Sequence, residues 1–561
     1  MLRNKGILLC IAVLLVALTL SAQTQDWLWV ARGGGESVDF SKAMANDNNG
    51  NSYFAGYFSG TTQLGGTSLT ATGGYDILIA KLDANGNWLW AKKAGGTGAD
   101  WALGIALDAN ANVYLTGYFS DSATFGSSTL VSNGISDAFI AKMDTNGNWM
   151  WAKNAGGISS DYGYAIAVDS SANVYVTGCF LGSADFGGTT LQSLGNTDVF
   201  ISKLNSAGDW LTTVQGGGVS YDYGYSIAVD DQFHVYLTGI FQGTTGFGTT
   251  SLSSVGGYDV FITKLDDSLN WLWAKRVGGS VSDWAYAIAV DSAHNIYLTG
   301  SFVGSITFGS QVINSTGNED IYIAKMDTNS NWMWARKAGG TSVDYSYSLA
   351  LDNTGNAYIG GYFTGSAAFG TFGVVSRGAT DAFIAKINSS GEWLWAKRAG
   401  GTSVDKGSAV STDINSNVYF TGTFYETASF VYTTVADSIM VTSGGAADVF
   451  VTKIGVPSAL ADETNIQQAP FSLGQNYPNP FNPTTSISFE VKDDRAFYNL
   501  SIYDLKGRKV TNLHSGLLTR GIHSLAWNGK DYNNNSVASG IYYYRLDNGN
   551  TYQTKKMVLM K

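Results

Sequence analysis

Short runs of alternating aromatic or aliphatic and small or polar residues recur along most of this chain at a fixed spacing. In the second full unit they cover residues 100–108, 112–119, 137–144 and 149–153. Runs of this length and composition predict four β-strands per unit. The unit is about 61 residues long, and its clearest markers are Trp27, Trp88, Trp149, Trp210, Trp271, Trp332 and Trp393.

The links between these strands indicate how they pair. The first link reads Asp-Ala-Asn-Ala-Asn and the third reads Asp-Thr-Asn-Gly-Asn, which predicts tight hairpins. The second link is longer and rich in Gly, Ser and Thr. The first proline is Pro457, as expected where strands are paired on both sides.

Four antiparallel strands repeated seven times predict an all-β fold, a seven-bladed β-propeller, in residues 23–455. The chain begins with a lone strand of the fourth type, at 27–32, and its last unit ends after a strand of the third type, at 448–454. The N-terminal strand is therefore predicted to complete the last blade. Such a closure removes two exposed sheet edges.

Side-chain size along the strands predicts how the blades pack. The first strand carries small residues at alternate positions, for example Gly163, Ala165 and Ala167, which suits strands crowded around an axis. A bulky residue at Gly163 should overpack the ring. Trp88 and Trp90, two residues apart on the fourth strand, are predicted to share one face and to pack between neighbouring blades.

The repeat resembles a known bacterial family. Asp169-Ser-Ser-Ala-Asn-Val-Tyr-Val-Thr-Gly178 and Asp198-Val-Phe-Ile-Ser-Lys203 are similar to the units called beta-propeller repeats. The resemblance covers about three quarters of the chain. It implies a fold and no defined activity.

The N-terminal segment has the three parts of a secretory signal peptide. Arg3 and Lys5 precede an apolar run, which ends near Ser21 and Ala22. We predict a signal peptide at 1–22 that is cleaved between Ala22 and Gln23. No later segment is apolar enough to span a membrane, so none is expected in the mature chain.

The C-terminal residues differ in composition from the repeats. All five prolines lie between Pro457 and Pro483, which predicts a linker at 456–470. Alternating strands with Asn/Gly turns predict a small immunoglobulin-like β-sandwich at 471–561. This segment resembles the C-terminal sorting domain of the type IX secretion system, by a motif formed by Tyr477, Pro478, Asn479, Pro480, Phe481, Asn482 and Pro483.

That resemblance implies a destination and a partner. Such a domain implies handling by the type IX machinery, a secreted or outer cell-surface location, and removal of the domain. An ordinary immunoglobulin-like accessory module is the alternative. The net charge is −11, although residues 471–561 carry 11 Lys and Arg against 6 Asp and Glu. The acidic remainder repels phosphate backbones, so no nucleic-acid partner is expected.

An Asp just before each first strand is the candidate ligand-binding position. Asp recurs at three positions in every unit: before the first strand, at the first hairpin, and at the start of the third strand. The first and third of these sets should face the rim on which propellers usually bind. Carboxylates beside aromatic rings suit a polysaccharide or a surface protein. Alternatively, these Asp residues accept N–H groups from the preceding Gly-Gly turn and the aromatics are core. The candidate Asp residues are Asp39, Asp100, Asp161, Asp222, Asp283, Asp344 and Asp405. The aromatic residues that follow them in the five middle units are Trp101, Tyr162, Tyr223, Trp284 and Tyr345. In the first and last units this position is occupied by Phe40 and Lys406.

Two further Asp positions recur in every unit. One, represented by Asp169, begins the first hairpin and is predicted to bond the turn backbone. The other, represented by Asp198, leads the third strand, with Lys203 five residues later. That odd spacing places the pair on opposite faces, so they should not bond each other.

Metal and catalytic chemistry find little support in the sequence. Calcium-loop spacing is absent, and His234 and His294 lie on separate turns, so no metal and no cofactor are predicted. We predict an exported, non-enzymatic binding or adhesion module. One alternative is a glycan-active hydrolase or lyase that uses rim carboxylates. It is favoured by a six-residue insertion in the last unit, which contains Glu426 and Asp437 and breaks the symmetry of the repeat. The other alternative is a structural surface or matrix component.

Overall fold

The structure is a computed structural model that describes residues 25–431, 438–456, 471–492, 496–504, 508–548 and 552–560. Its contacts divide the chain into two compact units, Met1–Pro457 and Ser458–Lys561. The predicted signal peptide with its cleavage between Ala22 and Gln23, and the predicted linker apart from Val456, lie outside the described residues. Within the described ranges, no helix is long and apolar enough to cross a membrane.

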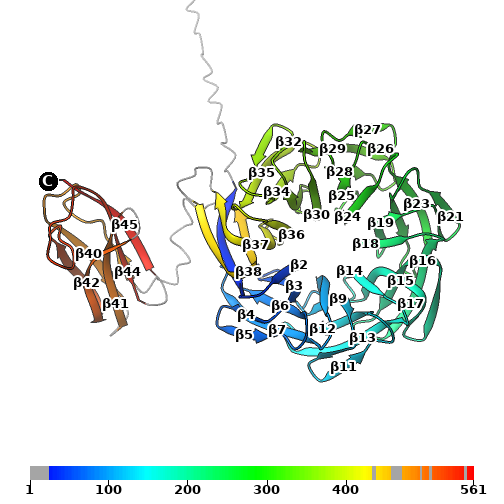
Figure 1. Cartoon of the computed structure of the whole chain (residues 1–561), viewed down its shortest axis with the longest axis horizontal. Helices are drawn as coiled ribbons and strands as arrows, with labels where there is room; N and C mark the ends of the chain where they lie inside the picture. Colours follow the sequence, from blue (N-terminus) through cyan, green and yellow to red (C-terminus); the bar gives the residue numbers. More distant parts are fainter. Residues whose placement is uncertain are drawn as a thin grey trace, which may run out of the picture. The chain divides into compact units, whose positions relative to one another are not determined.

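The first unit is a ring of antiparallel strands around a central axis (Figure 1). The strand pairings of the described residues give seven successive blades of four strands, and short hairpins between blades join several of them into larger sheets. The innermost strands are β2 (Asp39–Asn46), β8 (Trp101–Leu107), β14 (Tyr162–Val168), β18 (Asp222–Val229), β24 (Asp283–Val290), β30 (Asp344–Leu351) and β36 (Lys406–Thr412). The second strands are β3 (Ser52–Phe58), β9 (Val113–Phe119), β15 (Val174–Phe186), β19 (Val235–Phe241), β25 (Ile296–Phe302), β31 (Ala357–Phe363) and β37 (Val418–Val431).

Two further strands complete each sheet. The third strands are β6 (Asp76–Leu82), β12 (Asp137–Met143), β16 (Thr189–Leu204), β22 (Asp259–Leu265), β28 (Asp320–Met326), β34 (Asp381–Ile387) and β38 (Ser438–Gly455). The outer strands are β7 (Trp88–Gly96), β13 (Trp149–Gly157), β17 (Trp210–Gly218), β23 (Trp271–Val277), β29 (Trp332–Gly340), β35 (Trp393–Gly400) and β1 (Asp26–Gly35). The fold is the predicted β-propeller.

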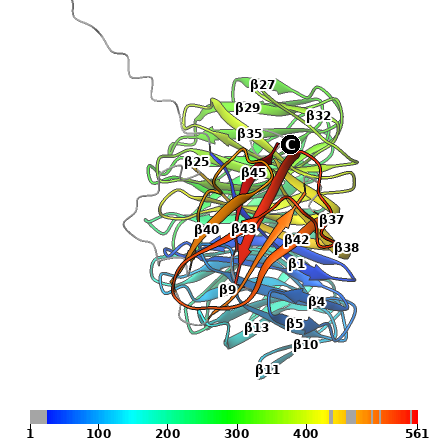
Figure 2. The same cartoon turned by 90° about the vertical axis from the view of Figure 1, so that its left-hand side faces the viewer.

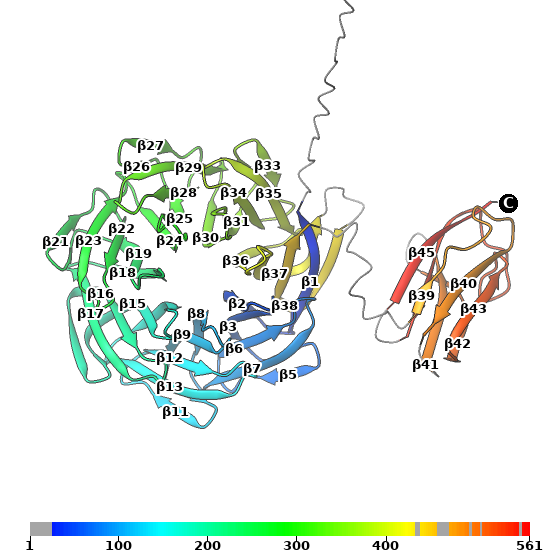
Figure 3. The same cartoon turned by 180° about the vertical axis from the view of Figure 1, so that it is seen from behind.

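The N-terminal strand closes the ring, as predicted. β1 pairs antiparallel with β38, from Asp26 opposite Gly455 to Gly33 opposite Val449. Figure 3 shows β1, in blue, beside β38, in yellow. β36, the innermost strand of this last blade, contacts β2 of the first blade. Both ends of the repeat array therefore meet in one sheet, in which β38 is paired on both sides, by β37 and by β1.

The link between second and third strands contains structure that the sequence did not predict. In the first blade it forms a hairpin of β4 (Thr61–Leu64) and β5 (Thr67–Thr70), and β4 pairs with the end of β1 in the neighbouring blade. The equivalent hairpins are β10 (Ser122–Phe125) with β11 (Ser128–Val131), β20 (Thr244–Phe247) with β21 (Thr250–Ser253), β26 (Ser305–Phe308) with β27 (Gln311–Asn314), and β32 (Ser366–Phe369) with β33 (Phe372–Val375). In the third and seventh blades the same pairing is continuous with the long second and third strands.

The two tryptophans of the outer strand pack between blades, but on opposite faces. In β7, Trp88 lies opposite Leu82 and Trp90 opposite Lys81, so a bulge leaves Leu89 between them without a partner. Trp88 packs in a cluster shared with the preceding blade, and Trp90 in one shared with the following blade. The expectation of one shared face was therefore wrong, because the bulge breaks the alternation.

The second unit is a small β-sandwich. One sheet contains β39 (Phe471–Leu473), β40 (Thr485–Val491) and β43 (Gly521–Trp527); the other contains β42 (Lys509–Leu518), β41 (Ala496–Tyr503), β44 (Gly540–Asp547) and β45 (Tyr552–Leu559). Side chains of both sheets form one core, and Figure 2 shows the strands of this unit in orange and red.

The Tyr477–Pro483 motif contacts this sandwich through the side chain of Phe481 and through hydrogen bonds of Tyr477, Pro478 and Asn479. Phe481 is buried in the core, and its backbone N–H donates to Val558 O at 3.0 Å. Asn476, just before the motif, is also buried and donates its side-chain N–H to Pro478 O and to Thr485 Oγ1. Tyr477 itself is 82% exposed. The motif therefore contains both a phenylalanine anchored in the core and a tyrosine whose side chain is exposed.

Candidate functional site

A cavity of about 530 Å³ opens on the axis of the ring. Every innermost strand contributes to it a residue at the same position, three after the first Asp of each unit. These residues are Lys42, Leu103, Tyr164, Tyr225, Tyr286, Tyr347 and Ser408.

A β-bulge in each innermost strand explains why these side chains reach the cavity. In β14, Gly163 lies opposite Gly178 and Ala165 lies opposite Thr177, so Tyr164 has no partner. The same shift occurs at the corresponding position of the other six innermost strands. A bulge re-aims the extra residue, and here it turns one side chain per blade toward the axis. Strict alternation, which the sequence suggested for this strand, stops at that residue.

One side of the cavity is aromatic. The rings of Tyr164 and Tyr225 have centroids 5.1 Å apart, those of Tyr225 and Tyr286 are 5.9 Å apart, and those of Tyr286 and Tyr347 are 4.9 Å apart. Burial raises the pKa of all four phenols, so they are neutral donors at ordinary pH. Four blades thus give a continuous set of ring faces and edges with hydroxyl groups.

The other side of the cavity is cationic. Lys42 and Lys406 line it, and no carboxylate is among the lining residues. In the part of the chain that the structure describes, neither lysine forms an ion pair. Burial, and then the nearby Lys406, lower the pKa of Lys42. An acidic protein therefore presents two lysines without an ion pair among the described residues at its axial cavity.

The predicted Asp residues before the first strands do not reach the cavity. Their carboxylates are buried, with at most 1% exposure, and each accepts the N–H of a glycine four residues earlier at 2.7–2.9 Å. The donors are Gly35, Gly96, Gly157, Gly218, Gly279, Gly340 and Gly401. The structure thus places Asp39, Asp100, Asp161, Asp222, Asp283, Asp344 and Asp405 in the turn role that was the alternative.

Burial also changes the protonation of these carboxyls. It raises the pKa of Asp39, Asp100, Asp161, Asp222 and Asp283 to about 7, and that of Asp344 and Asp405 to about 6. The neighbouring Asp of the third strand adds to this rise, as Asp76 does for Asp100. The first and third sets are therefore adjacent and buried inside the blades, and do not both face the rim as the sequence predicted.

The predicted aromatics continue the aromatic side of the cavity outward. Tyr162, Tyr223, Trp284 and Tyr345 have ring centroids 5.7–6.2 Å from the cavity tyrosine of their own strand. Trp101 stacks on Tyr57 at 3.9 Å. All five are partly exposed. They therefore extend the apolar surface that the four cavity tyrosines begin.

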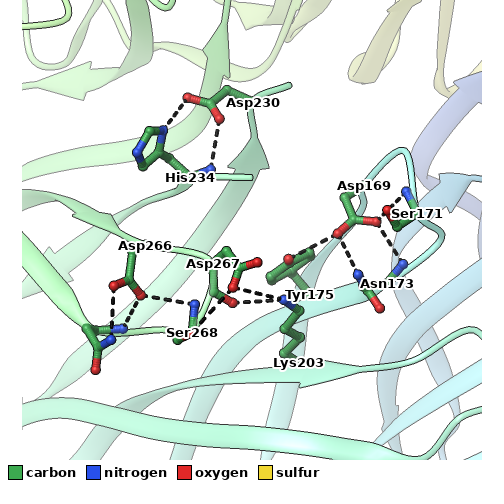
Figure 4. A network of polar contacts seen from close by, with 11 residues as sticks. Asp169, Ser171, Asn173, Tyr175, Lys203, Asp230, His234, Asp266, Asp267 and Ser268 are labelled. Carbon is green, nitrogen blue, oxygen red and sulfur yellow. Dashed lines mark hydrogen bonds and ion pairs between the residues drawn. The ribbon is translucent and has the colours of Figure 1, made fainter. Parts of the chain in front are cut away.

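The other recurring charges hold turns and blades together. Asp169 accepts the N–H groups of Ser171 and Asn173 and the hydroxyl of Tyr175, which is the predicted turn role (Figure 4). Lys203 lies over the Tyr175 ring at 5.2 Å and donates to Asp267 O, in the next blade, at 2.8 Å. Five of the seven third-strand Asp residues form an ion pair with the outer strand instead, as Asp76 does with Lys93 at 2.6 Å. Asp and Lys of one third strand therefore do not bond each other, as expected.

The insertion in the last unit extends the hairpin of that blade. β37 pairs with β38 from Thr427 opposite Thr442 to Val431 opposite Ser438. Glu426 accepts a hydrogen bond from the Thr402 hydroxyl at 3.1 Å, and Asp437 lies outside the described residues.

Sequence reasoning missed the cavity position itself. Its signal was present, because tyrosine recurs at 61-residue spacing in four consecutive units, at 164, 225, 286 and 347. Strict alternation along the strand would place that residue on the face away from the cavity. The bulge that turns it toward the cavity is not visible in the sequence.

Comparison with known families matches both parts of the chain. Residues 475–560 match the secretion system C-terminal sorting domain, and residues 272–301 match the beta-propeller repeat. An uncharacterized WD repeat-containing protein, L264, of Acanthamoeba polyphaga mimivirus is 25% identical over an alignment of 499 residues that covers 71% of this chain. The chain spans 36% of the length of that relative.

Two solved structures are also similar in part. One is a fungal alcohol oxidase of the AA5 family in complex with copper, with 10% identity, a TM-score of 0.41, and coverage of 96% of this chain and 100% of the other. The second is PorZ of Porphyromonas gingivalis, described as a surface component of the type IX secretion system, with 11% identity, a TM-score of 0.22, and coverage of 94% and 100%.

Proposed function

Because this chain is a β-propeller protein with a C-terminal sorting domain of the type IX secretion system, secreted or attached to the outer surface, we propose that it is a non-enzymatic binding module. Its ligand would occupy the axial cavity. The observation that carries the proposal is the composition of that cavity, with four tyrosines on one side and two lysines on the other.

The lining chemistry favours an acidic polysaccharide. Tyrosine faces and hydroxyls suit sugar rings, and Lys42 and Lys406 suit a carboxylate or sulfate on the sugar. The cavity volume falls within the range of about 300–1,000 Å³ that is typical of small-ligand sites. It would therefore take a chain end or a short stretch of a polymer.

Binding fits this cavity better than hydrolysis. Glycoside hydrolysis uses a pair of carboxylates on either side of the scissile bond. The lining residues supply rings, hydroxyls and cations instead, and the seven first-set Asp residues are buried in turns.

The test is binding of the full chain to a uronate polymer, such as polygalacturonate, and to neutral dextran. Affinity electrophoresis measures binding, and assays for reducing ends and unsaturated products run in parallel. We expect uronate binding that weakens with salt, and a loss of at least tenfold in Lys42→Gln/Lys406→Gln. Lys92→Gln/Lys153→Gln is the matched control, since these lysines lie in outer strands and not at the cavity.

Each other result has a definite meaning. Products would make the chain an enzyme and overturn the proposal. Equal losses of affinity in the two double variants would show that the ligand does not bind in the cavity. If neither polymer binds, the acidic-polysaccharide proposal fails, and a protein partner or a structural role takes its place.

A further inference from the structure

Both histidines of the propeller lie where the repeat is otherwise regular. The first hairpin turn of each unit has five residues, beginning with Asp and ending with Asn. In the fourth unit His234 replaces the final Asn. The same turn has Asp231 at its second position, where the other six turns have no acidic residue. In the fifth unit, His294 occupies the fourth position, which elsewhere holds Gly, Ala, Phe or Ser. Three departures from the repeat thus fall in two turns that are 61 residues apart.

The ring brings these two turns together. His294 Nδ1 lies 3.5 Å from Asp230 Oδ2, and His294 Nε2 lies 3.6 Å from Asp231 Oδ1. One ligand atom from each of Asp230, Asp231 and His294 lies within 4.8 Å of the others. His294 Nδ1 is enclosed and has no hydrogen-bond partner, although its side chain is within reach of two carboxylates.

One of these distances suits a tetrahedral metal ion. Ligand atoms about 2.0–2.2 Å from zinc are about 3.3–3.6 Å from each other along the edges of a tetrahedron, and Asp230 Oδ2 and His294 Nδ1 are 3.5 Å apart. Asp231 faces the other ring nitrogen, so its exposed side chain must turn toward Nδ1 to complete the site. Imidazole and carboxylate together select zinc and similar transition metals over calcium or magnesium, which prefer oxygen ligands alone. Asp231 is exposed, which leaves an entry path and room for water as the fourth ligand.

Asp230 is already held in position by its own turn. It accepts the hydroxyl of Tyr236 at 2.9 Å and lies 3.1 Å from His234 Nδ1, a contact drawn in Figure 4. Contacts of this kind fix the orientation of a metal ligand and raise affinity. His234 is therefore a positioning residue, while Asp230, Asp231 and His294 are the ligands.

We propose that Asp230, Asp231 and His294 form a zinc-binding site that joins the fourth and fifth blades. Zinc would clamp two blades that otherwise meet only by packing and hydrogen bonds. The site lies on the first-hairpin turns and includes no residue of the axial cavity, so it is independent of the proposed binding function.

The chain supplies its own matched variants. Asp231→Ser and His294→Gly install residues that sister turns carry at Ser170, Ser292, Gly50 and Gly355, so the turns should still fold. His294 has φ of 60°, a conformation that glycine adopts readily. His523→Gln, in the sandwich, is the control for an unrelated histidine.

The experiment titrates zinc into the chelator-treated full chain, without a histidine tag, by calorimetry and by thermal shift. We expect one saturable site per chain and a rise in Tm with zinc, both lost in Asp231→Ser/His294→Gly and kept in His523→Gln. His234→Asn, which restores the usual turn residue, should weaken binding about 10- to 100-fold. Absence of a saturable site, an unchanged site in the double variant, or loss in His523→Gln would each overturn the proposal.

Discussion

At the scale of single residues, the recurring carboxylates and glycines of this chain are components of its turns and blade contacts. Each first-set Asp takes an N–H from a Gly-Gly turn, and each turn Asp, such as Asp169, takes two backbone N–H groups. Repetition alone therefore does not identify a binding residue. The residues that differ from blade to blade lie at the bulge, where they line the axial cavity, and in two hairpin turns, where they form the proposed zinc site.

Gly163 tests how closely the blades approach. A Cβ at this residue would lie 2.1 Å from Thr116 Oγ1 of the preceding blade, so Gly163→Ala should lower the free energy of unfolding by about 1–3 kcal/mol. Gly66→Ala is the control, since a Cβ there meets nothing within 4 Å. Denaturant unfolding of both variants measures the difference. Equal stability of the two would show that the blades can yield at this contact.

At the scale of elements, bulges and hairpins decide which residues meet. A bulge in each innermost strand turns one residue toward the axis, and a bulge in the outer strand, as in β7, separates its two tryptophans. The hairpins that the sequence did not predict pair with the end of the outer strand of the neighbouring blade, as β4 does with β1. Successive blades are therefore joined by main-chain hydrogen bonds as well as by side-chain packing.

The closing strand should be more sensitive than its equivalents. Trp27 of β1 is fully buried and donates Nε1–H to Val431 O at 3.2 Å, between segments 404 residues apart. Trp27→Ala should cost about 3–5 kcal/mol and increase proteolysis, because it weakens the contact that closes the ring. Trp149→Ala, at the equivalent position of β13, should cost less, since Trp149 is only partly buried. Equal losses in thermal unfolding would contradict a special role for closure.

At the scale of the whole molecule, the seven buried first-set carboxyls should govern how stability depends on pH. Their folded pKa values are about 6 to 7, above the value of 3.8 for an unperturbed Asp. The folded chain therefore holds protons that the unfolded chain releases between about pH 4 and 7. By linkage, stability falls as pH rises through this window and is greater at pH 5.5 than at pH 8.

We expect this gain to be about 2 kcal/mol or more in sum, since one pKa unit at one group is worth about 1.4 kcal/mol. Thermal unfolding at the two pH values measures it. Asp100→Asn keeps an acceptor for the Gly96 N–H and should reduce the pH dependence, while Asp83→Asn, at a turn carboxyl of lowered pKa, should not. A protein more stable at pH 8 than at pH 5.5 would contradict the burial of these groups.

The sequence by itself determined the ring and the nature of the C-terminal domain. The 61-residue period and the lone first strand predict the blades and their closure, because strand pattern and turn chemistry are local properties. The Tyr477–Pro483 motif likewise lies within one short segment. Residues whose role depends on their own turn, such as Asp169, could be predicted in the same way.

Only the tertiary structure decided which side chains form sites. The bulge at Tyr164 depends on its register with β15, and the hairpin β4–β5 is completed by a strand of another blade. Lys42 and Lys406 meet in one cavity, and His294 meets Asp230, although each pair is far apart in the chain. Register and ring closure are long-range properties, so residue spacing could not reveal these contacts.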